Sequence, residues 1–299
     1  MEKRRLGKTD MDVSILGFGG MEIGYQHISL STAKRLLNEV LDRGINVVDT
    51  AECYSTSEEL IGEAIAARRK DFYLFTKCGH ESGWTYPDWR PESLFRSVER
   101  SLKRLKTNHV DLIQLHSCSE AELRNGKVIE TLQRMRERGY TRYVGYSGDS
   151  KAALFATESG QFDALQISVS IADQEALELI LPAAEQRSLG VMAKRPLANI
   201  AWHNGDRPPS DSYGRTYWER LQRLKYEFLH GDSNRAISTA LRFSLSVPGV
   251  HTAIVGTTKP ERIAENAKAV ETGRLSEQAY ENIRARWRQV ARASWVGQT

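Results

Sequence analysis

Four side chains that can exchange protons follow short apolar segments in the first half of the chain. Asp49 lies at the end of INVVDT (45–50), and Tyr54 follows five residues later in DTAECY. Lys77 ends FYLFTK, and His116 follows DLIQL. If these segments are parallel strands, their carboxyl ends meet on one rim and bring an acid, a phenol, an amine and an imidazole together. Such a group is suited to acid–base chemistry on a bound small molecule.

Each of these residues alone also has an ordinary structural explanation. Asp49 could cap the next helix, Lys77 could be a surface charge, and Tyr54 could be an amphipathic residue of the rim. Lys77 and His116, however, both end apolar strands, where a polar side chain emerges over a pocket. We therefore interpret the four residues as one functional group.

The segments that must position these residues alternate between helix and strand patterns. Residues 31–44 place apolar side chains at helical spacing and end in a glycine that suits a left-handed cap; the apolar positions are Ala33, Leu36, Leu37, Val40 and Leu41. A second predicted helix begins at Pro91, and a third ends at Gly139. Each precedes a strand-like segment, which is the pattern of repeated βα units.

Eight strand-like segments are spread along the chain. They span residues 16–19, 45–50, 72–77, 110–117, 142–148, 163–168, 189–194 and 251–256. Over the first half of the chain their ends are about thirty residues apart, which is the size of a βα unit. The sequence therefore predicts an α/β fold, a (β/α)₈ TIM barrel, in one domain over residues 1–299.

Three further segments complete this predicted barrel. The turn residues Lys8, Thr9 and Asp10 lie between short half-apolar runs and predict an N-terminal β-hairpin at the bottom of the barrel. Residues 79–90 and 196–216 break the alternation of helix and strand, and we expect them to form long loops over the C-terminal rim. Long loops in that position are often functional.

The composition is that of an ordinary globular protein. Hydrophobic residues make up 40% and charged residues 27% of the 299 residues, which argues against a disordered chain and against a membrane protein. The net charge of +4 is weak evidence for a nucleic-acid partner. No apolar run of signal-peptide length is present at the amino terminus, and three cysteines are too few for a disulfide framework. We expect a cytoplasmic protein.

The cysteines and histidines do not predict a metal site. The sequence has no HExxH motif and no paired-cysteine spacing, and its histidines are scattered. Cys53, Cys78 and Cys118 lie next to the four residues described above, and we expect them to be small buried apolar side chains that point away from the pocket centre. Oxidation or alkylation of these thiols is then expected to disturb the site.

Four motifs resemble signatures of the aldo-keto reductase family, in the family's order and over nearly the whole chain. They are DTAECY, the strand ending in TK, DLIQLH and VGTTKPERIAEN. The resemblance implies that Asp49, Tyr54, Lys77 and His116 form a catalytic tetrad that reduces a carbonyl with NADPH. Tyr54 then donates the proton, and we expect the ammonium of Lys77 to lower its pKa. Asp49 is expected to hold Lys77, and a neutral His116 to orient the carbonyl.

The last of these motifs also predicts where a cofactor phosphate binds. Residues 256–266 follow a strand and open a helix near Pro260, so their backbone amides favour an anion. The resemblance places the adenosine 2′-phosphate here and therefore favours NADP over NAD. It also implies nicotinamide contacts near strands one, five, six and seven. The predicted cofactor residues are Gly19, Met21, Asp49, Ser147, Gln166, Lys194, Arg195, Leu197, Gly256, Thr257, Thr258, Lys259, Arg262, Glu265 and Asn266.

Two positions depart from the family pattern. The family usually has Asn after the serine that corresponds to Ser147, whereas here Gly148 and Asp149 follow, and Asp149 is a candidate substitute. Many relatives carry an aromatic residue at the end of strand seven, where this chain reads AKRPLAN (193–199). Lys194 and Arg195 could instead meet the pyrophosphate or a substrate carboxylate, and the planar Arg195 could stack on reduced nicotinamide.

The substrate is predicted only as a class. Trp84, Trp89 and Trp202 indicate an aromatic mouth for an apolar or sugar-like aldehyde or ketone. We expect a monomer without a membrane or nucleic-acid partner. Two alternatives stay open. One is a cofactor-sensing subunit with little turnover, like the aldo-keto-reductase-like proteins of potassium channels, and the other is a barrel hydrolase that uses carboxylates or a metal.

Overall fold

Eight parallel strands close into a barrel, as predicted. The computed structural model describes residues 1–81 and 83–299. The strands follow one another around the barrel in the order β10-β3-β4-β5-β6-β7-β8-β9. They are β3 (Leu16–Gly19), β4 (Val47–Asp49), β5 (Tyr73–Cys78), β6 (Val110–His116), β7 (Thr141–Ser147), β8 (Ala164–Ser168), β9 (Gly190–Lys194) and β10 (Thr252–Gly256). All eight lie within or overlap the predicted segments.

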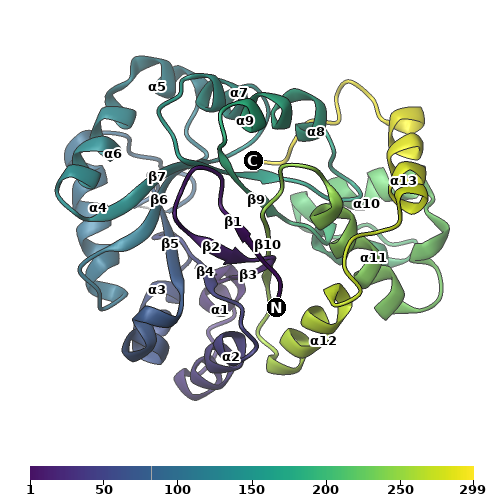
Figure 1. Cartoon of the computed structure of the whole chain (residues 1–299), viewed down its shortest axis with the longest axis horizontal. Coiled ribbons are helices and arrows are strands. Elements are labelled where there is room, and N and C mark those ends of the chain that lie inside the picture. Colours follow the sequence, from purple (N-terminus) through teal and green to yellow (C-terminus); the bar gives the residue numbers. More distant parts are fainter. Residues whose placement is uncertain (82) are drawn as a thin grey trace.

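Helices surround this barrel (Figure 1). The α-helices are α1 (Met21–Tyr25), α2 (Leu30–Asp42), α3 (Ser57–Ile65), α4 (Pro91–Arg104), α5 (Glu120–Asn125), α6 (Lys127–Glu137), α7 (Ser150–Glu158), α8 (Ala176–Leu179), α9 (Leu181–Gln186), α10 (Ser212–Leu224), α11 (Ser233–Ser246), α12 (Pro260–Val270) and α13 (Glu277–Val290). Three 3₁₀ segments are η1 (Ala66–Asp71), η2 (Ala198–Asn204) and η3 (Glu227–Leu229). In the described part of the chain, no helix is long and apolar enough to cross a membrane.

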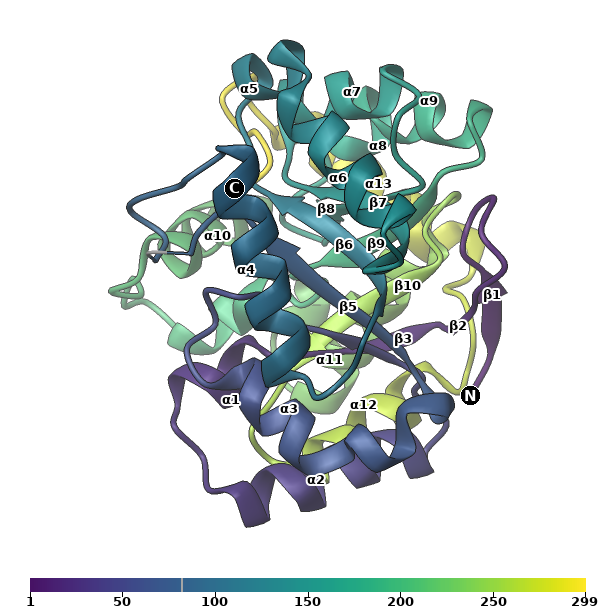
Figure 2. The same ribbon diagram turned by 90° about the vertical axis from the view of Figure 1, so that its left-hand side faces the viewer.

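The predicted N-terminal hairpin closes one end of the barrel. Strands β1 (Lys3–Arg5) and β2 (Asp12–Ser14) pair antiparallel. Leu6, Met11 and Val13 are fully buried and pack in one cluster with barrel residues such as Phe75 and Leu112. Figure 2 shows the hairpin at one end of the molecule, while the segment between β5 and α4 lies at the other end. The hairpin therefore fills the bottom of the barrel interior.

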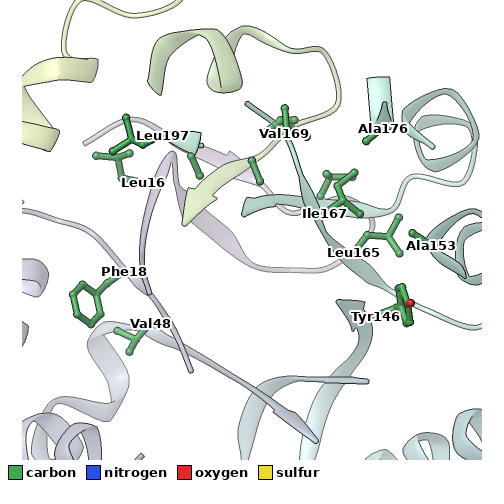
Figure 3. Packing of buried hydrophobic residues seen from close by; sticks show 14 of the residues in the cluster. Leu16, Phe18, Val48, Tyr146, Ala153, Leu165, Ile167, Val169, Ala176 and Leu197 are labelled. Atoms are coloured by element: carbon green, nitrogen blue, oxygen red, sulfur yellow. The ribbon is translucent and has the colours of Figure 1, made fainter. Parts of the chain in front are cut away.

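A second apolar layer lies between the strands and the helices. Helix α2 illustrates its origin, because the predicted positions Leu36, Leu37 and Val40 are all buried. The side chain of Ser29 accepts a hydrogen bond from the backbone of Thr32 and so caps this helix. Figure 3 shows buried side chains of this layer, with Phe18 and Val48 close together on neighbouring strands.

The two long segments over the rim differ from each other. Between Gly79 and Arg90 the described residues form turns and bends, as predicted. The segment 196–216, predicted as a loop, instead contains η2 and the first turns of α10. Its backbone is left-handed at Ala198, Asn199 and Ile200, a conformation that sequence periodicity does not reveal. Local strain of this kind often occurs at binding sites.

Candidate active site

A cavity of about 440 Å³ opens at the carboxyl ends of the barrel strands. The last residues of six strands line it, together with Gln166 of β8 and residues of the loops. The lining residues are Gly19, Met21, Glu22, Asp49, Tyr54, Trp84, His116, Ser117, Ser147, Gln166, Lys194, Arg195, Pro196, Leu197, Asn199, Ile200, Asp211, Tyr213, Ile254, Val255 and Gly256. This rim is where active sites of (β/α)₈ barrels lie.

A buried ion pair lies beside the cavity, which its acidic member Asp49 lines. Lys77 Nζ lies 2.6 Å from Asp49 Oδ2 and donates a second hydrogen bond to the carbonyl of Thr50 at 2.8 Å. Lys77 is 1% exposed and Asp49 is 3% exposed. The amide of Gln114 also donates to Asp49, at 3.3 Å. Neighbouring strands β4 and β5 carry the two charges, so the pairing of these strands positions the pair.

Tyr54 lies beside this ion pair, on the turn that follows β4. Lys77 Nζ is 5.0 Å from the centre of the Tyr54 ring, and the ring of His116 meets Tyr54 edge-on at 5.6 Å. Burial raises the pKa of Tyr54 well above 10, and the negative charge of Asp49 raises it further. We expected Lys77 to leave this pKa below its usual value, and that expectation is wrong. Loss of solvent and the charge of Asp49 outweigh the nearby positive charge, and the phenol therefore stays protonated at neutral pH.

His116 ends β6 and is held from two sides. Burial and the nearby charge of Lys77 lower its pKa well below 6.5, so the imidazole is neutral. Its Nδ1 lies 3.5 Å from the Sγ of Cys53. Its backbone carbonyl lies 2.7 Å from Nε2 of His80, a residue of the segment after β5. The imidazole thus faces the cavity between Tyr54 and that segment.

Of the three tryptophans predicted to contact substrate, only Trp84 lines the cavity. Its ring stacks on His80 at 4.4 Å and meets the ring of His116 edge-on at 4.9 Å. Trp89 packs behind His80 and over Gly79, where a Cβ would collide with the indole. Trp202 lies in η2 against the core. The prediction that Trp89 and Trp202 line the mouth is therefore corrected.

The opposite wall offers a hydrogen-bonding group without a partner. Ser147 and Gln166 are paired across β7 and β8, and the Ser147 hydroxyl donates to Gln166 Oε1 at 3.1 Å. Nε2 of Gln166 is buried and makes no hydrogen bond within the described residues. A buried amide nitrogen without a partner is costly unless a ligand satisfies it. A carboxamide oxygen of a nicotinamide has the chemistry to do so.

Asp149, the candidate substitute for the family's asparagine, does not line the cavity. Its carboxylate pairs with Lys194 at 2.8 Å and accepts hydrogen bonds from the backbone and hydroxyl of Ser168 at 2.7 and 3.1 Å. These partners occupy its oxygens. Asp149 therefore orients the end of β9 and does not replace the asparagine at the cavity.

The end of β9 places two cations at the cavity wall. Burial lowers the pKa of Lys194 to about 8, although the ion pair with Asp149 opposes the shift. Arg195 lies over the ring of Tyr213 at 4.2 Å and donates to the Ser168 hydroxyl at 3.3 Å and to the carbonyl of Gln298. Tyr213 is an aromatic residue beside the cavity that the sequence analysis missed. It comes from α10, far from β9 in sequence.

The predicted phosphate segment begins at the cavity and continues outside it. Gly256 lines the cavity, whereas Arg262 is half exposed and pairs with Glu265 at 2.5 Å. Of the remaining predicted residues, Thr257, Thr258 and Lys259 precede α12 and Asn266 is buried within it, and none of them lines the cavity. Glu22 stands directly over Gly256, where a Cβ would collide with its carboxylate, and burial raises the pKa of Glu22.

The cavity includes other residues that the sequence analysis did not single out. Several adjoin predicted ones, as Glu22 adjoins Met21 and Val255 adjoins Gly256, so a wider window around each motif would have included them. Asp211 and Tyr213 come from a segment without a periodic pattern and carry no such signal.

The three thiols also differ from one another. Cys78 and Cys118 are 1% exposed, as small buried apolar side chains are. Cys53 is only partly buried, so the expectation of a buried side chain is wrong for this thiol; it does not line the cavity, but its Sγ contacts His116. In residues 1–81 and 83–299, no cluster of three or more His, Cys, Asp or Glu side chains could hold a metal ion.

Comparison with known proteins identifies the family. An uncharacterized oxidoreductase of Bacillus subtilis, YqkF, is 28% identical over 306 residues, which cover 97% of each chain. A probable voltage-gated potassium channel subunit beta of Arabidopsis thaliana is also 28% identical, over 91% of this chain and 92% of the relative. The solved holo form of aldo-keto reductase AKR11C1 from Bacillus halodurans matches with a TM-score of 0.84 at 28% identity, covering 98% of this chain and 99% of that one.

The family model covers most of the barrel. The model of the aldo/keto reductase family matches residues 15–288, which include every strand of the barrel. Asp49, Tyr54, Lys77 and His116 all lie within the matched range. This chain therefore belongs to the aldo/keto reductase family of oxidoreductases.

Proposed function

We propose that this protein reduces an aldehyde or ketone to an alcohol with NADPH and that Tyr54 donates the proton. The observation that carries the proposal is the placement of a protonated phenol and a neutral imidazole at the cavity, with a buried ammonium beside the phenol. When bound, NADPH supplies the hydride. In the reverse direction Tyr54 accepts the proton from an alcohol.

The four residues divide the proton chemistry among them. Tyr54 Oη transfers its proton to the carbonyl oxygen as that oxygen gains negative charge, because its high pKa keeps the phenol protonated until then. The Lys77 ammonium stabilises the resulting phenolate, and Asp49 holds that ammonium in place. His116 is neutral and can donate one hydrogen bond to the carbonyl oxygen.

Residues on the opposite wall fit a nicotinamide dinucleotide. Gln166 Nε2 supplies a donor for the carboxamide, with Ser147 fixing the orientation of the Gln166 side chain. Lys194, Arg195 and Leu197 line the path toward Gly256 and offer two positive charges for phosphate oxygens. The start of α12, with Lys259 and Arg262, is the proposed 2′-phosphate site, which favours NADP over NAD.

The mouth of the cavity favours a substrate with an apolar or ring-shaped body. Met21 and Trp84 line the cavity as large, substantially exposed side chains, and the exposed Tyr25 lies nearby. Tyr25 lies 6.3 Å from the Tyr54 ring. We propose a small aldehyde, ketone or sugar as substrate. We also propose that the protein works in the cytoplasm as a monomer, without a nucleic-acid partner.

The decisive experiment measures NADPH and NADH consumption with a panel of small aldehydes, ketones and aldoses. Tyr54→Phe removes the proton donor and keeps the ring. We expect the wild type to turn over with NADPH preferred, and the variant to bind NADPH with similar affinity while kcat falls by about 10²-fold or more. If Tyr54→Phe retains most of the wild-type activity, Tyr54 is not the proton donor.

The similarity to a probable channel beta subunit supports one second candidate, a cofactor-sensing subunit with little turnover. The same assay separates the two. Tight NADPH binding by wild type and variant, with no carbonyl in the panel reduced by either, would favour the sensing role over the reductase.

A further inference from the structure

The two ring nitrogens of His116 have different surroundings, because Nδ1 contacts Cys53 and Nε2 does not. Nδ1 lies 3.5 Å from Sγ of Cys53, while Nε2 makes no hydrogen bond within the described residues, and the residue lines the cavity. Cys53 precedes Tyr54 on the turn after β4, and its carbonyl accepts a hydrogen bond from Tyr25 at 2.9 Å. That hydrogen bond holds the backbone of the turn that carries the thiol.

The protonation states of the two groups decide which of them donates. The imidazole is neutral because its pKa is lowered, so it carries a hydrogen on only one nitrogen. Burial raises the pKa of Cys53 to about 12, which keeps its hydrogen on sulfur. When S–H donates to Nδ1, the imidazole hydrogen must lie on Nε2. When Nδ1–H donates to sulfur, Nε2 is left as an acceptor and has no hydrogen to give to a carbonyl oxygen.

We propose that Cys53 is a positioning residue whose thiol holds His116 in the tautomer with its hydrogen on Nε2, facing the substrate carbonyl. The proposal rests on the carbonyl reduction proposed above. The thiol never touches the reacting atoms, and it acts only through the imidazole. A thiol is a weak donor, so its removal is expected to lower the rate by a modest factor and not to abolish it.

The direct test is nitrogen NMR of the protein labelled with ¹⁵N at histidine, in its complex with NADP⁺. The His116 signals are assigned as those missing from His116→Gln. We expect wild type to show a protonated Nε2 and an unprotonated Nδ1, Cys53→Ala to shift toward a mixture of tautomers, and Cys53→Ser, which keeps a donor, to restore the wild-type pattern. Wild type with its hydrogen on Nδ1, or identical signals in wild type and Cys53→Ala, would overturn the proposal.

Kinetics provide a second readout. We expect kcat of Cys53→Ala to fall about three- to tenfold with little change in KM, and Cys53→Ser to recover most of the loss. Cys118→Ala is the matched control, because it also removes a thiol, and among the described residues the hydrogen bond to the His116 ring comes from Cys53. A Cys53→Ser enzyme as slow as Cys53→Ala would contradict the proposal.

The proposed role of Cys53 and the proposed carbonyl reduction can be disproved independently of each other. The nitrogen signals are measured without any carbonyl turnover, so they report on Cys53 even if no substrate is found. If Cys53→Ala leaves the nitrogen signals unchanged and Tyr54→Phe is inactive, the positioning role of Cys53 is ruled out and the proposed reduction stands. Full activity of Tyr54→Phe would disprove the proposed mechanism, whatever the nitrogen signals show.

Discussion

In this site, burial changes the pKa values of single residues more than the charges of their neighbours do. Tyr54 has a raised pKa because loss of solvent and the carboxylate of Asp49 outweigh the positive charge of Arg195. Lys194 shows the corresponding effect for a cation, because burial lowers its pKa to about 8 despite the ion pair with Asp149. The residue types were readable from the sequence, but their protonation behaviour was not.

The pKa of Lys194 predicts how cofactor binding depends on pH. Lys194 loses its positive charge as the pH rises through about 8. An anionic cofactor binds better to the charged form, so its affinity is highest below that pH and falls above it. We expect the Kd of NADPH to rise about threefold to tenfold between pH 7 and pH 9, measured by fluorescence titration.

The matched variant for this test is Lys194→Gln. It has no charge to lose, so we expect weaker NADPH binding with little pH dependence over the same range. If the wild-type Kd stays constant, or if the Lys194→Gln variant keeps the full pH dependence, another group controls binding.

Among the elements, the segment between β5 and α4 contributes Trp84 to the cavity lining. The backbone N–H of His80 donates to Glu52 Oε1 at 2.6 Å, and its ring nitrogen lies 2.7 Å from the carbonyl of His116. Trp84 stacks on that same ring. One histidine therefore joins the segment to β6 and holds the tryptophan over the site. The sequence predicted a functional loop here but not which of its aromatics faces the cavity.

Removing the His80 side chain is expected to release Trp84. We expect His80→Ala to raise KM for an apolar aldehyde about tenfold, with a smaller effect on kcat, because the stacking partner and the bond to the His116 carbonyl are both lost. Steady-state kinetics of a double-mutant cycle with Trp84→Ala checks the coupling. If the effects of the two substitutions on KM simply add, His80 does not act through Trp84.

At the scale of the whole molecule, the two ends of the barrel have separate tasks. The cavity lies at the carboxyl ends of the strands, and the N-terminal hairpin fills the interior at the other end. Met11 is fully buried there. The stability of the barrel and the chemistry of the site are therefore expected to respond to different substitutions.

Met11→Ala tests this separation. The substitution leaves a cavity in the barrel interior, and we expect the free energy of unfolding in urea to fall by about 2–5 kcal/mol. Cofactor affinity and kcat are expected to stay close to wild type. Leu30→Ala is the control, because Leu30 is 38% exposed and its loss should cost less than about 0.5 kcal/mol. A parallel drop in kcat would show that the two ends are coupled.

The sequence by itself determined the barrel and the positions of the four reactive side chains. Apolar periodicity and glycine or proline signals are local, so the eight strands and helices such as α2 and α4 could be read directly. The residues that end each strand then share one rim by topology alone. Asp49, Lys77 and His116 were found in this way, and Tyr54 followed from its place in the same motif.

Only the tertiary structure decided what surrounds those side chains. Tyr213 contacts Arg195 from a helix that begins in a segment predicted as loop. Asp149 forms an ion pair with Lys194. Cys53 turns toward His116, and Trp89 packs away from the cavity. These outcomes depend on contacts between distant parts of the chain and on the loss of solvent around each group, neither of which has a periodic signature in the sequence.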